Sequence, residues 1–266
     1  MKTHYIDAHC HLQFEQFADD REDIISQMQE QGVAAIVVGC DFESSQKAVV
    51  LAEKHEHLYA AIGLHPTDAG GEHYAASAYR ALAAHKKVIA IGECGLDYFR
   101  PEEVTDAVKD IQKDIFKEHI QLAAERNLPL IIHARPSKGT QDAYEDVIKI
   151  LEEEKRADPR VRGDIHFFVG GIREAEAFIA LGFTVSFTAV ITFAREYDAV
   201  VRAIPLTSIL GETDAPYVAP LARRGKRNDP LAVIAVVEKI AELRGEDPDL
   251  VRTTLAGNTR RVFSLP

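Results

Sequence analysis

The chain has 266 residues, 46% of them hydrophobic, so it can bury a substantial core and a disordered chain is excluded. Its formal net charge of -11 argues against a protein that coats nucleic acid with a broad basic surface, but not against a small site for an anionic substrate. The three cysteines have no CxxC spacing, and the first residues lack the apolar segment of a secretory signal. We therefore expect a cytoplasmic protein with free thiols.

Short apolar runs rich in β-branched residues alternate with longer amphipathic stretches, as is typical of parallel strands joined by crossover helices. The runs cover residues 4–9, 34–40, 58–64, 88–93, 128–134, 164–170, 183–189 and 208–214. Helices are expected, for example, over 19–31, 103–126 and 230–244, and the longest irregular segment over 217–229. These units, with no Gly-rich dinucleotide fingerprint after the first strand, predict one α/β domain over residues 1–266, a (β/α)8 TIM barrel.

One uncharged stretch, residues 177–194, approaches the length of a membrane span. Gly182 divides it into the end of a helix and an alternating, β-branched strand. We therefore expect no membrane segment.

In such a barrel the active site forms where the strands end, so the place of a residue in its unit predicts its role. The histidines and carboxylates at strand ends are His9, His11, His65, Glu93, His133, His166, Glu212 and Asp214. His55 and His57 have the same HxH spacing as His9 and His11 but precede the third predicted strand, so we assign them no metal. The remaining histidines are expected at a strand start (His4) or on outward-facing helices (His73, His85 and His119).

The spacing of His9 and His11 places both imidazoles on one face of an extended segment, where they can chelate one ion. Cys10 points away from them, and it and Cys94 are expected to be structural thiols. Asp7 shares the parity of the two histidines, and we expect it either to orient a ligand or to be a structural hydrogen-bond acceptor.

Any one of these groups could be only a satisfied polar residue, but together they form a convergent set of nitrogen and oxygen ligands. Four histidines with Glu93 and Asp214 exceed a tetrahedral zinc site and suit two divalent ions about 3.5–4 Å apart. Glu93 is central in strand order and could bridge them. Two such ions would lower the pKa of a bound water from about 15.7 toward about 7, and Asp214 could accept its proton. Asp214 and Glu93 are therefore the candidate catalytic residues.

Seven short motifs follow one another along nearly the whole chain: DAHCHL, GLHP, IGECGLDYFR, IIHAR, GETDAPY, RGKRNDP and GNTRRVF. In these motifs the chain closely resembles the TatD-like metal-dependent deoxyribonucleases of the amidohydrolase superfamily. The resemblance implies a TIM barrel with a two-metal centre that hydrolyses nucleic-acid phosphodiesters, often from the 3′ end. It also implies that His9, His11 and Asp214 hold one ion, that His133 and His166 hold the other, and that Glu93 bridges them. Zn²⁺ suits the imidazole-rich ligands, and Mg²⁺ or Mn²⁺ commonly supports this chemistry in the family.

Two segments depart from the family pattern. The chain has HFFVGG where the family usually has HCFSG, and ARPSKGTQDAYEDV follows His133 in place of the common continuation. Both should frame the substrate rather than the metals, so they leave the substrate open.

Basic residues near the strand ends are candidate phosphate contacts because arginine pairs well with phosphate oxygens. We assign substrate binding to His65, Arg135, Arg224, Lys226 and Arg227. Such a small basic patch on an acidic protein favours a DNA end as the substrate. We expect no membrane partner, and a monomer is compatible with the sequence.

Three functions are compatible with this site. The first is a deoxyribonuclease that acts on single-stranded or frayed DNA 3′ ends. The second is a metal-dependent hydrolase of an acyl bond, such as a small-molecule lactone or amide or an aminoacyl-tRNA ester. The third, a non-catalytic scaffold, would require an incomplete ligand set, whereas every expected position is filled.

Overall fold

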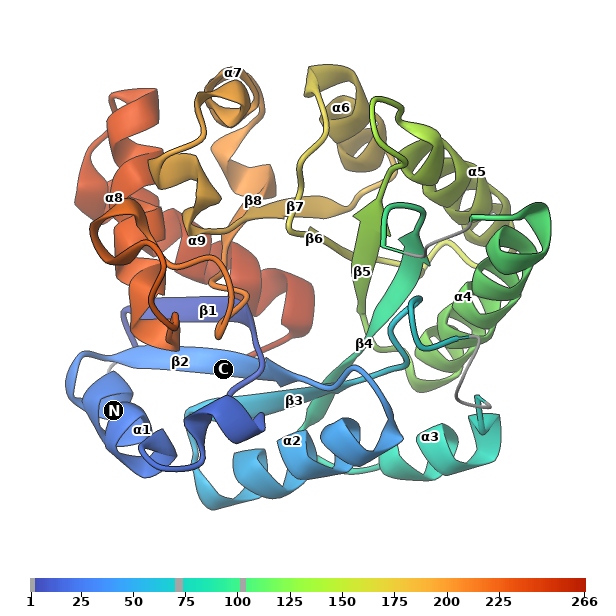
Figure 1. Ribbon diagram of the computed structural model, residues 1–266, viewed down its shortest axis with the longest axis horizontal. Coiled ribbons are helices and arrows are strands. Elements are labelled where there is room, and N and C mark those ends of the chain that lie inside the picture. The colour runs from blue at the N-terminus through green and yellow to red at the C-terminus, as the bar shows by residue number, and fades with distance from the viewer. Residues whose placement is uncertain (1–2, 70–73, 101–103) are drawn as a thin grey trace.

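The computed structural model describes residues 3–69, 74–100 and 104–266. Its parallel strands are hydrogen-bonded in chain order, and the helices form a ring outside them (Figure 1). The strands are β1 (Tyr5–Cys10), β2 (Val33–Val38), β3 (Leu58–Ile62), β4 (Val88–Asp97), β5 (Leu130–Arg135), β6 (Gly163–His166), β7 (Thr184–Phe187) and β8 (Ile209–Gly211). The helices are α1 (Arg21–Glu30), α2 (Phe42–Lys54), α3 (Ala76–Leu82), α4 (Asp106–Arg126), α5 (Asp142–Ala157), α6 (Ile172–Ala180), α7 (Asp198–Ala203), α8 (Val233–Arg244) and α9 (Pro248–Phe263).

The sheet closes where β1 meets the segment after β8. The N–H of Asp214 donates to the carbonyl of His9 at 2.9 Å, and the N–H of His11 donates to that of Ala215 at 2.7 Å. The (β/α)8 barrel predicted from the sequence is therefore confirmed, and its closure brings the end of β1 beside the segment that follows β8.

The helix α9 covers the other end of the barrel. Its Val262 and Phe263 pack with inward-facing strand residues, among them Ala8 and Ile131. The side-chain amide of Asn258 donates to the carbonyl at the start of β8, Ile209, at 2.9 Å. Active sites of such barrels lie at the opposite end, where the strands finish.

Bulges in β1 and β4 place one extra residue beside the site. Across β1 and β2, Asp7 pairs with Ala35 and Cys10 with Val37, so the two intervening residues of β1 lie opposite one residue of β2. Ala35 belongs to the large hydrophobic cluster that the strands form with the surrounding helices, here called the outer hydrophobic cluster. Asp7, paired with Ala35, therefore faces that layer rather than the site.

The expected shared parity of Asp7 with His9 is accordingly wrong, because simple alternation does not continue through a bulge. The carboxylate of Asp7 accepts hydrogen bonds from the N–H and the hydroxyl of Thr213, at 2.8 and 2.6 Å. Of its two expected roles, the structure shows the structural acceptor, which ties β1 to the segment after β8.

Glycines make the β4 bulge possible. Gly95 has φ +135, and a Cβ there would collide with the carbonyl oxygen of His133. Gly92 has φ +154 and directly precedes Glu93. These residues let β4 run close against β5 while Glu93 points into the barrel.

His119 corrects another expectation, since it is fully buried rather than outward-facing. Its Nδ1 is 2.8 Å from the carbonyl oxygen of Ile115, and its Nε2 accepts from the N–H of Leu64 at 3.0 Å. It satisfies backbone groups between α4 and β3. His85 is partly exposed and pairs with Glu53, and His73 lies outside the described residues.

No described helix is long and apolar enough to cross a membrane. The uncharged stretch 177–194 folds into the end of α6, then β7 and a short 3-10 turn. Gly182, with φ +81, separates the helix from the strand, as expected.

Candidate metal centre and substrate cavity

The candidate ligands converge at the ends of five different strands. His9 belongs to β1 and His11 follows it, Glu93 lies in β4, His133 in β5, His166 ends β6, and Asp214 follows β8. All six side chains are buried, with exposed fractions between 0% and 7%. The chain therefore builds a deep cluster of imidazole and carboxylate groups from segments far apart in sequence.

Glu93 lies between two subsets of these groups. Its Oε2 is 3.4 Å from Nε2 of His9 and 3.8 Å from Nε2 of His11. Its Oε1 is 2.9 Å from Nδ1 of His133 and 3.7 Å from Nε2 of His166. Oε2 thus faces His9 and His11, whereas Oε1 faces His133, His166 and also His65, whose Nε2 is 3.4 Å away.

Asp214 completes the first subset. Its Oδ1 is 3.4 Å from Nε2 of His11 and 4.0 Å from Nε2 of His9. The residue has φ +53, a conformation that aspartate tolerates better than most side chains.

This donor set fits divalent cations. The Nε2 atoms of His9 and His11 face each other at only 3.2 Å, and Nδ1 of the fully buried His9 has no hydrogen-bond partner. Among the described residues, four groups of three have all their ligand atoms within 4.8 Å of one another: His9–His11–Glu93, Glu93–His133–His166, His9–His166–Asp214 and His65–Asp97–His133. A proton can serve one such contact, whereas a cation can accept several lone pairs at once.

Other residues hold three of the imidazoles from behind. Nδ1 of His11 is 2.8 Å from the carbonyl oxygen of Val38, and Nδ1 of His166 is 3.0 Å from Oε2 of Glu212. Nε2 of His133 is 2.9 Å from Oδ2 of Asp97. Such partners orient a ligating imidazole and select its tautomer.

Sequence reasoning did not identify Asp97. The predicted strand ended at Glu93, whereas β4 continues to Asp97. The signal was present, since alternation from Glu93 places Gly95 and Asp97 on the same face. His65, predicted to bind substrate, also lies here, with its Nε2 3.4 Å from Oε1 of Glu93.

The electrostatics of the cluster keep its carboxylates ionised, whereas the same carboxylates raise the pKa of His133 to about 9, so an ion bound there must displace a proton. Burial would raise the pKa of Glu93, but the imidazoles of His65, His133 and His9 hold that pKa well below its ordinary value. Burial also opposes ionisation of Asp97, yet its contact with His133 lowers the pKa of Asp97 to about 2. Burial lowers the pKa of His9, so this imidazole is neutral at pH 7. Neutral imidazoles and ionised carboxylates are the forms that bind metals.

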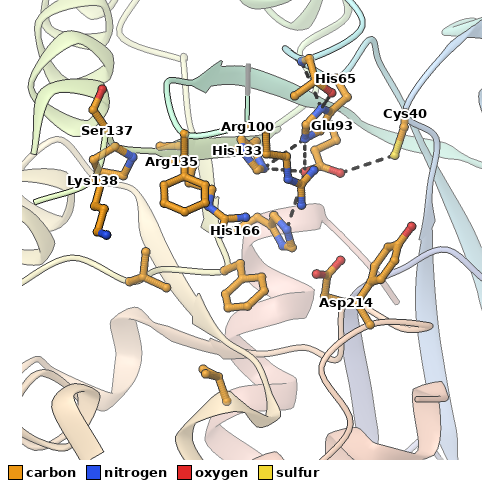
Figure 2. Close-up of a pocket in the computed structure, with 18 of the residues that line it drawn as sticks. Cys40, His65, Glu93, Arg100, His133, Arg135, Ser137, Lys138, His166 and Asp214 are labelled. Carbon is orange, nitrogen blue, oxygen red and sulfur yellow. Dashed lines mark hydrogen bonds and ion pairs between the residues drawn. The ribbon is translucent and has the colours of Figure 1, made fainter. Parts of the chain in front are cut away.

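A cavity of about 920 Å³ opens above the cluster. Arg100, Arg135, Ser137 and Lys138 line it beside the candidate ligands, and Figure 2 shows Ser137 and Lys138 on the side opposite Asp214. Of these only Arg135 was predicted from the sequence. Arg100 and Lys138 were missed because nothing in the sequence shows which loops meet over the site.

The other predicted substrate contacts lie elsewhere. Arg224, Lys226 and Arg227 are exposed and are not among the residues that line this cavity. The guanidinium of Arg227 pairs with Asp20, with Nη1 3.0 Å from Oδ1, and lies over the ring of Phe17. The structure does not bring these cations to the cluster, and their role in substrate binding stays a prediction.

Among the cysteines, Cys40 follows β2 and lines the cavity, with its Sγ 3.6 Å from Oε2 of Glu93. Cys10 and Cys94 are buried in the outer hydrophobic cluster. The structural role expected for the latter two agrees with this position.

Comparison with known proteins identifies the family. Residues 6–264 match the family described as TatD related DNase. The chain belongs to this family. It is 40% identical over 263 residues to a metal-dependent hydrolase, YabD, of Bacillus subtilis, covering 97% of this chain and 98% of the relative. It is also 34% identical over 261 residues to a protein of Cronobacter sakazakii named 3′-5′ ssDNA/RNA exonuclease TatD, covering 93% of each.

A solved structure shows the same fold. The crystal structure of YjjV, a TatD homologue from Escherichia coli, has a TM-score of 0.89, 30% sequence identity and complete coverage of both chains. This chain is thus a metal-dependent hydrolase of the TatD family, with clusters of histidine and acidic residues able to bind metal.

Both segments that depart from the TatD pattern line the cavity. Phe167 and Val169 come from HFFVGG, and Ser137 and Lys138 come from the segment after His133. Both segments therefore contribute side chains to the wall of the cavity.

Proposed function

We propose that the chain hydrolyses phosphodiester bonds at the 3′ ends of single-stranded or frayed DNA, using two divalent ions, Zn²⁺, Mg²⁺ or Mn²⁺. One observation carries this proposal: a buried cluster of histidine and acidic ligands lies beneath a cavity whose wall carries Arg100, Arg135 and Lys138. The name of the Cronobacter relative supports a nucleic-acid substrate.

The ligands divide into two positions in this proposal. His9, His11 and Asp214 would hold one ion and His133 and His166 the other. Glu93 lies between the two subsets and would be shared by both ions.

When bound, the ions polarise the scissile phosphate and acidify the attacking water. Asp214 would accept a proton from the attacking water: burial opposes its ionisation, but His11 beside it lowers the pKa of Asp214, so the carboxylate is charged at neutral pH. Arg135 and Lys138 contact the phosphates of the strand, and arginine suits them because its planar group donates two hydrogen bonds together.

The depth of the cluster supports a strand end as substrate. Every proposed ligand is at least nine-tenths buried, so a phosphate must enter the cavity to reach it. A terminal or unpaired nucleotide can do so, whereas a phosphate inside a continuous duplex is held on a rigid helix. We therefore expect single-stranded ends to be cleaved faster than blunt duplex ends.

The test compares the wild-type protein with Glu93→Gln by metal analysis and by hydrolysis of 3′-labelled single-stranded DNA, duplex DNA, RNA and generic esters and amides. Glu93→Gln should bind fewer than two ions and cleave DNA at least about 100-fold more slowly. Loss of a residue that only hydrogen-bonds to a metal ligand already lowers metal affinity or activity about 10–100-fold.

His55→Gln is the matched control, since His55 belongs to the second HxH pair and lies before β3, away from the cluster. It should keep both ions and full activity. Two ions and full activity in Glu93→Gln would exclude the bridging role. Intact DNA alongside cleavage of an ester or amide would replace the nuclease with the acyl hydrolase.

A further inference from the structure

Phe167 has a backbone conformation that bulky side chains rarely adopt. Its φ is +47, in the left-handed region that favours glycine. Its N–H donates to Oε1 of Glu212 at 2.7 Å, and the next N–H, of Phe168, donates to the carbonyl of Ser186 at 2.9 Å. The surrounding contacts thus hold the strained turn, and such strain at a site points to a function for the residue.

The turn directs two adjacent rings to different surroundings. Phe168 is fully buried in the outer hydrophobic cluster. Phe167 is only partly buried and lines the cavity, with its ring centroid 5.9 Å from that of His166 and edge-on to it. An aromatic ring therefore stands directly beside a candidate metal ligand.

Other apolar groups extend this wall. Val169 follows on the same loop, and Val190 and Tyr197 reach the cavity from the segment after β7; all are partly buried. Covering partly exposed apolar groups with a ligand removes them from water and favours binding, so this wall suits a flat apolar group.

A second wall of the cavity carries cations without acidic partners. The guanidinium carbon of Arg135 lies 4.2 Å from the centroid of the exposed Phe99 ring. Within the described parts of the chain, no carboxylate lies within ion-pair distance of Arg135 or Lys138. Figure 2 shows both on one side of the cavity, with His166 between them and Asp214.

We propose that Phe167, Val169, Val190 and Tyr197 form a base pocket, in which the base of the terminal nucleotide stacks on Phe167 while its phosphate contacts Arg135 and Lys138. This inference rests on the proposed nuclease function. A nucleotide joins a flat, largely apolar ring to an anion, and the two walls match these two parts. The cavity volume of about 920 Å³ is that of a site for one small ligand.

The test measures equilibrium binding of deoxyadenosine 5′-monophosphate and of 2-deoxyribose 5-phosphate to the metal-loaded protein. The wild type should bind the nucleotide roughly tenfold or more tightly, which is the usual contribution of one stacked base. Phe167→Gly should remove most of this preference while metal content stays unchanged. Glycine adopts the same positive φ, so this variant removes the ring and leaves the turn intact.

Two further variants separate the ring from other effects. Asn127→Gly changes another residue of positive φ, 53, at the end of α4, and should leave the preference unchanged. Arg135→Gln should weaken both ligands to a similar extent, because it removes a phosphate contact. A preference near one in the wild type, or one that Phe167→Gly retains, overturns the base pocket.

Cleavage of single-stranded DNA, measured on the same samples, distinguishes this failure from failure of the proposed function. DNA cleavage without a base preference leaves the nuclease and removes the pocket. A base preference without DNA cleavage keeps the pocket as a nucleotide site and removes the nuclease. If neither ligand binds, the pocket is overturned.

Discussion

Asp97 lies behind the candidate ligands and fixes the orientation of His133. Its Oδ2 contacts Nε2 of His133, while Nδ1 of the same ring faces Glu93. Gln112 anchors the backbone of Asp97 on both sides, accepting from its N–H at 2.9 Å and donating to its carbonyl at 3.0 Å. The carboxylate therefore presents a defined nitrogen of His133 to the cavity.

We expect Asp97→Asn to weaken metal binding at the His133 position about 10–100-fold, because an amide can present its N–H₂ group to Nε2 and leave the ring less well oriented. Titration with a competing chelator should show one weakened ion and one unchanged ion. Arg100→Gln is the control, since Arg100 lies on the exposed side of Asp97 and should alter substrate affinity rather than metal affinity. Equal affinity of both ions in Asp97→Asn would contradict this role.

The loop between β5 and α5 is the element that presents Lys138. Asp142 organises it: Oδ1 accepts from the N–H of Ser137 at 2.9 Å and from the hydroxyl of Thr140 at 2.8 Å. Lys109 of α4 adds an ion pair at 3.0 Å to Oδ2. Asp142 thus attaches the loop between β5 and α5 to α4. The sequence of this loop departs from the family pattern.

Asp142→Asn should lower the free energy of unfolding by about 1–2 kcal/mol, the range for hydrogen bonds to a charged group that is partly exposed. Burial opposes ionisation, but the contacts with Ser137 and Lys109 hold the pKa of Asp142 below its unfolded value of 3.8. Its contribution is therefore complete above pH 3.8 and is lost as the pH falls through the lower folded-state pKa.

Denaturant unfolding of both proteins across this pH range checks the prediction. The stability difference should be present at pH 7 and shrink below pH 3.8. A difference that is constant down to the lowest pH would mean that Asp142 acts through packing rather than through its charge.

At the scale of the whole molecule, the two ends of the barrel have separate tasks. The candidate site occupies the end where the strands finish, and α9 fills the other end with Val262 and Phe263. Stability and metal binding should therefore be separable by mutation.

Phe263→Ala should destabilise the fold by about 3–5 kcal/mol, because truncating a buried ring leaves a cavity. Bound metal in the folded protein should be unchanged, since Val262 and Phe263 of α9 pack at the opposite end of the barrel from the proposed ligands. Unfolding in denaturant with a chelator present, together with metal analysis in buffer, tests both statements. Loss of metal from the folded variant would show that the two ends are coupled.

Much of this molecule could be predicted from its sequence, because periodicity is local. Apolar runs of the right length predicted the strands, and the position of His9, His133 or Asp214 at the end of a run predicted the cluster. The second HxH pair was rejected on the same ground. Its position before β3, at the other end of the barrel, agrees with that prediction.

What the tertiary structure alone decided depends on contacts between distant segments. The bulge in β1 turns Asp7 away from the site, and the length of β4 brings Asp97 to His133. Asp20 holds Arg227 across 207 positions of sequence, away from the cavity. The candidate ligands are recognised by residue type and by their place at strand ends, so the sequence suffices to propose them, whereas cavity walls depend on how loops pack and become visible only in the fold.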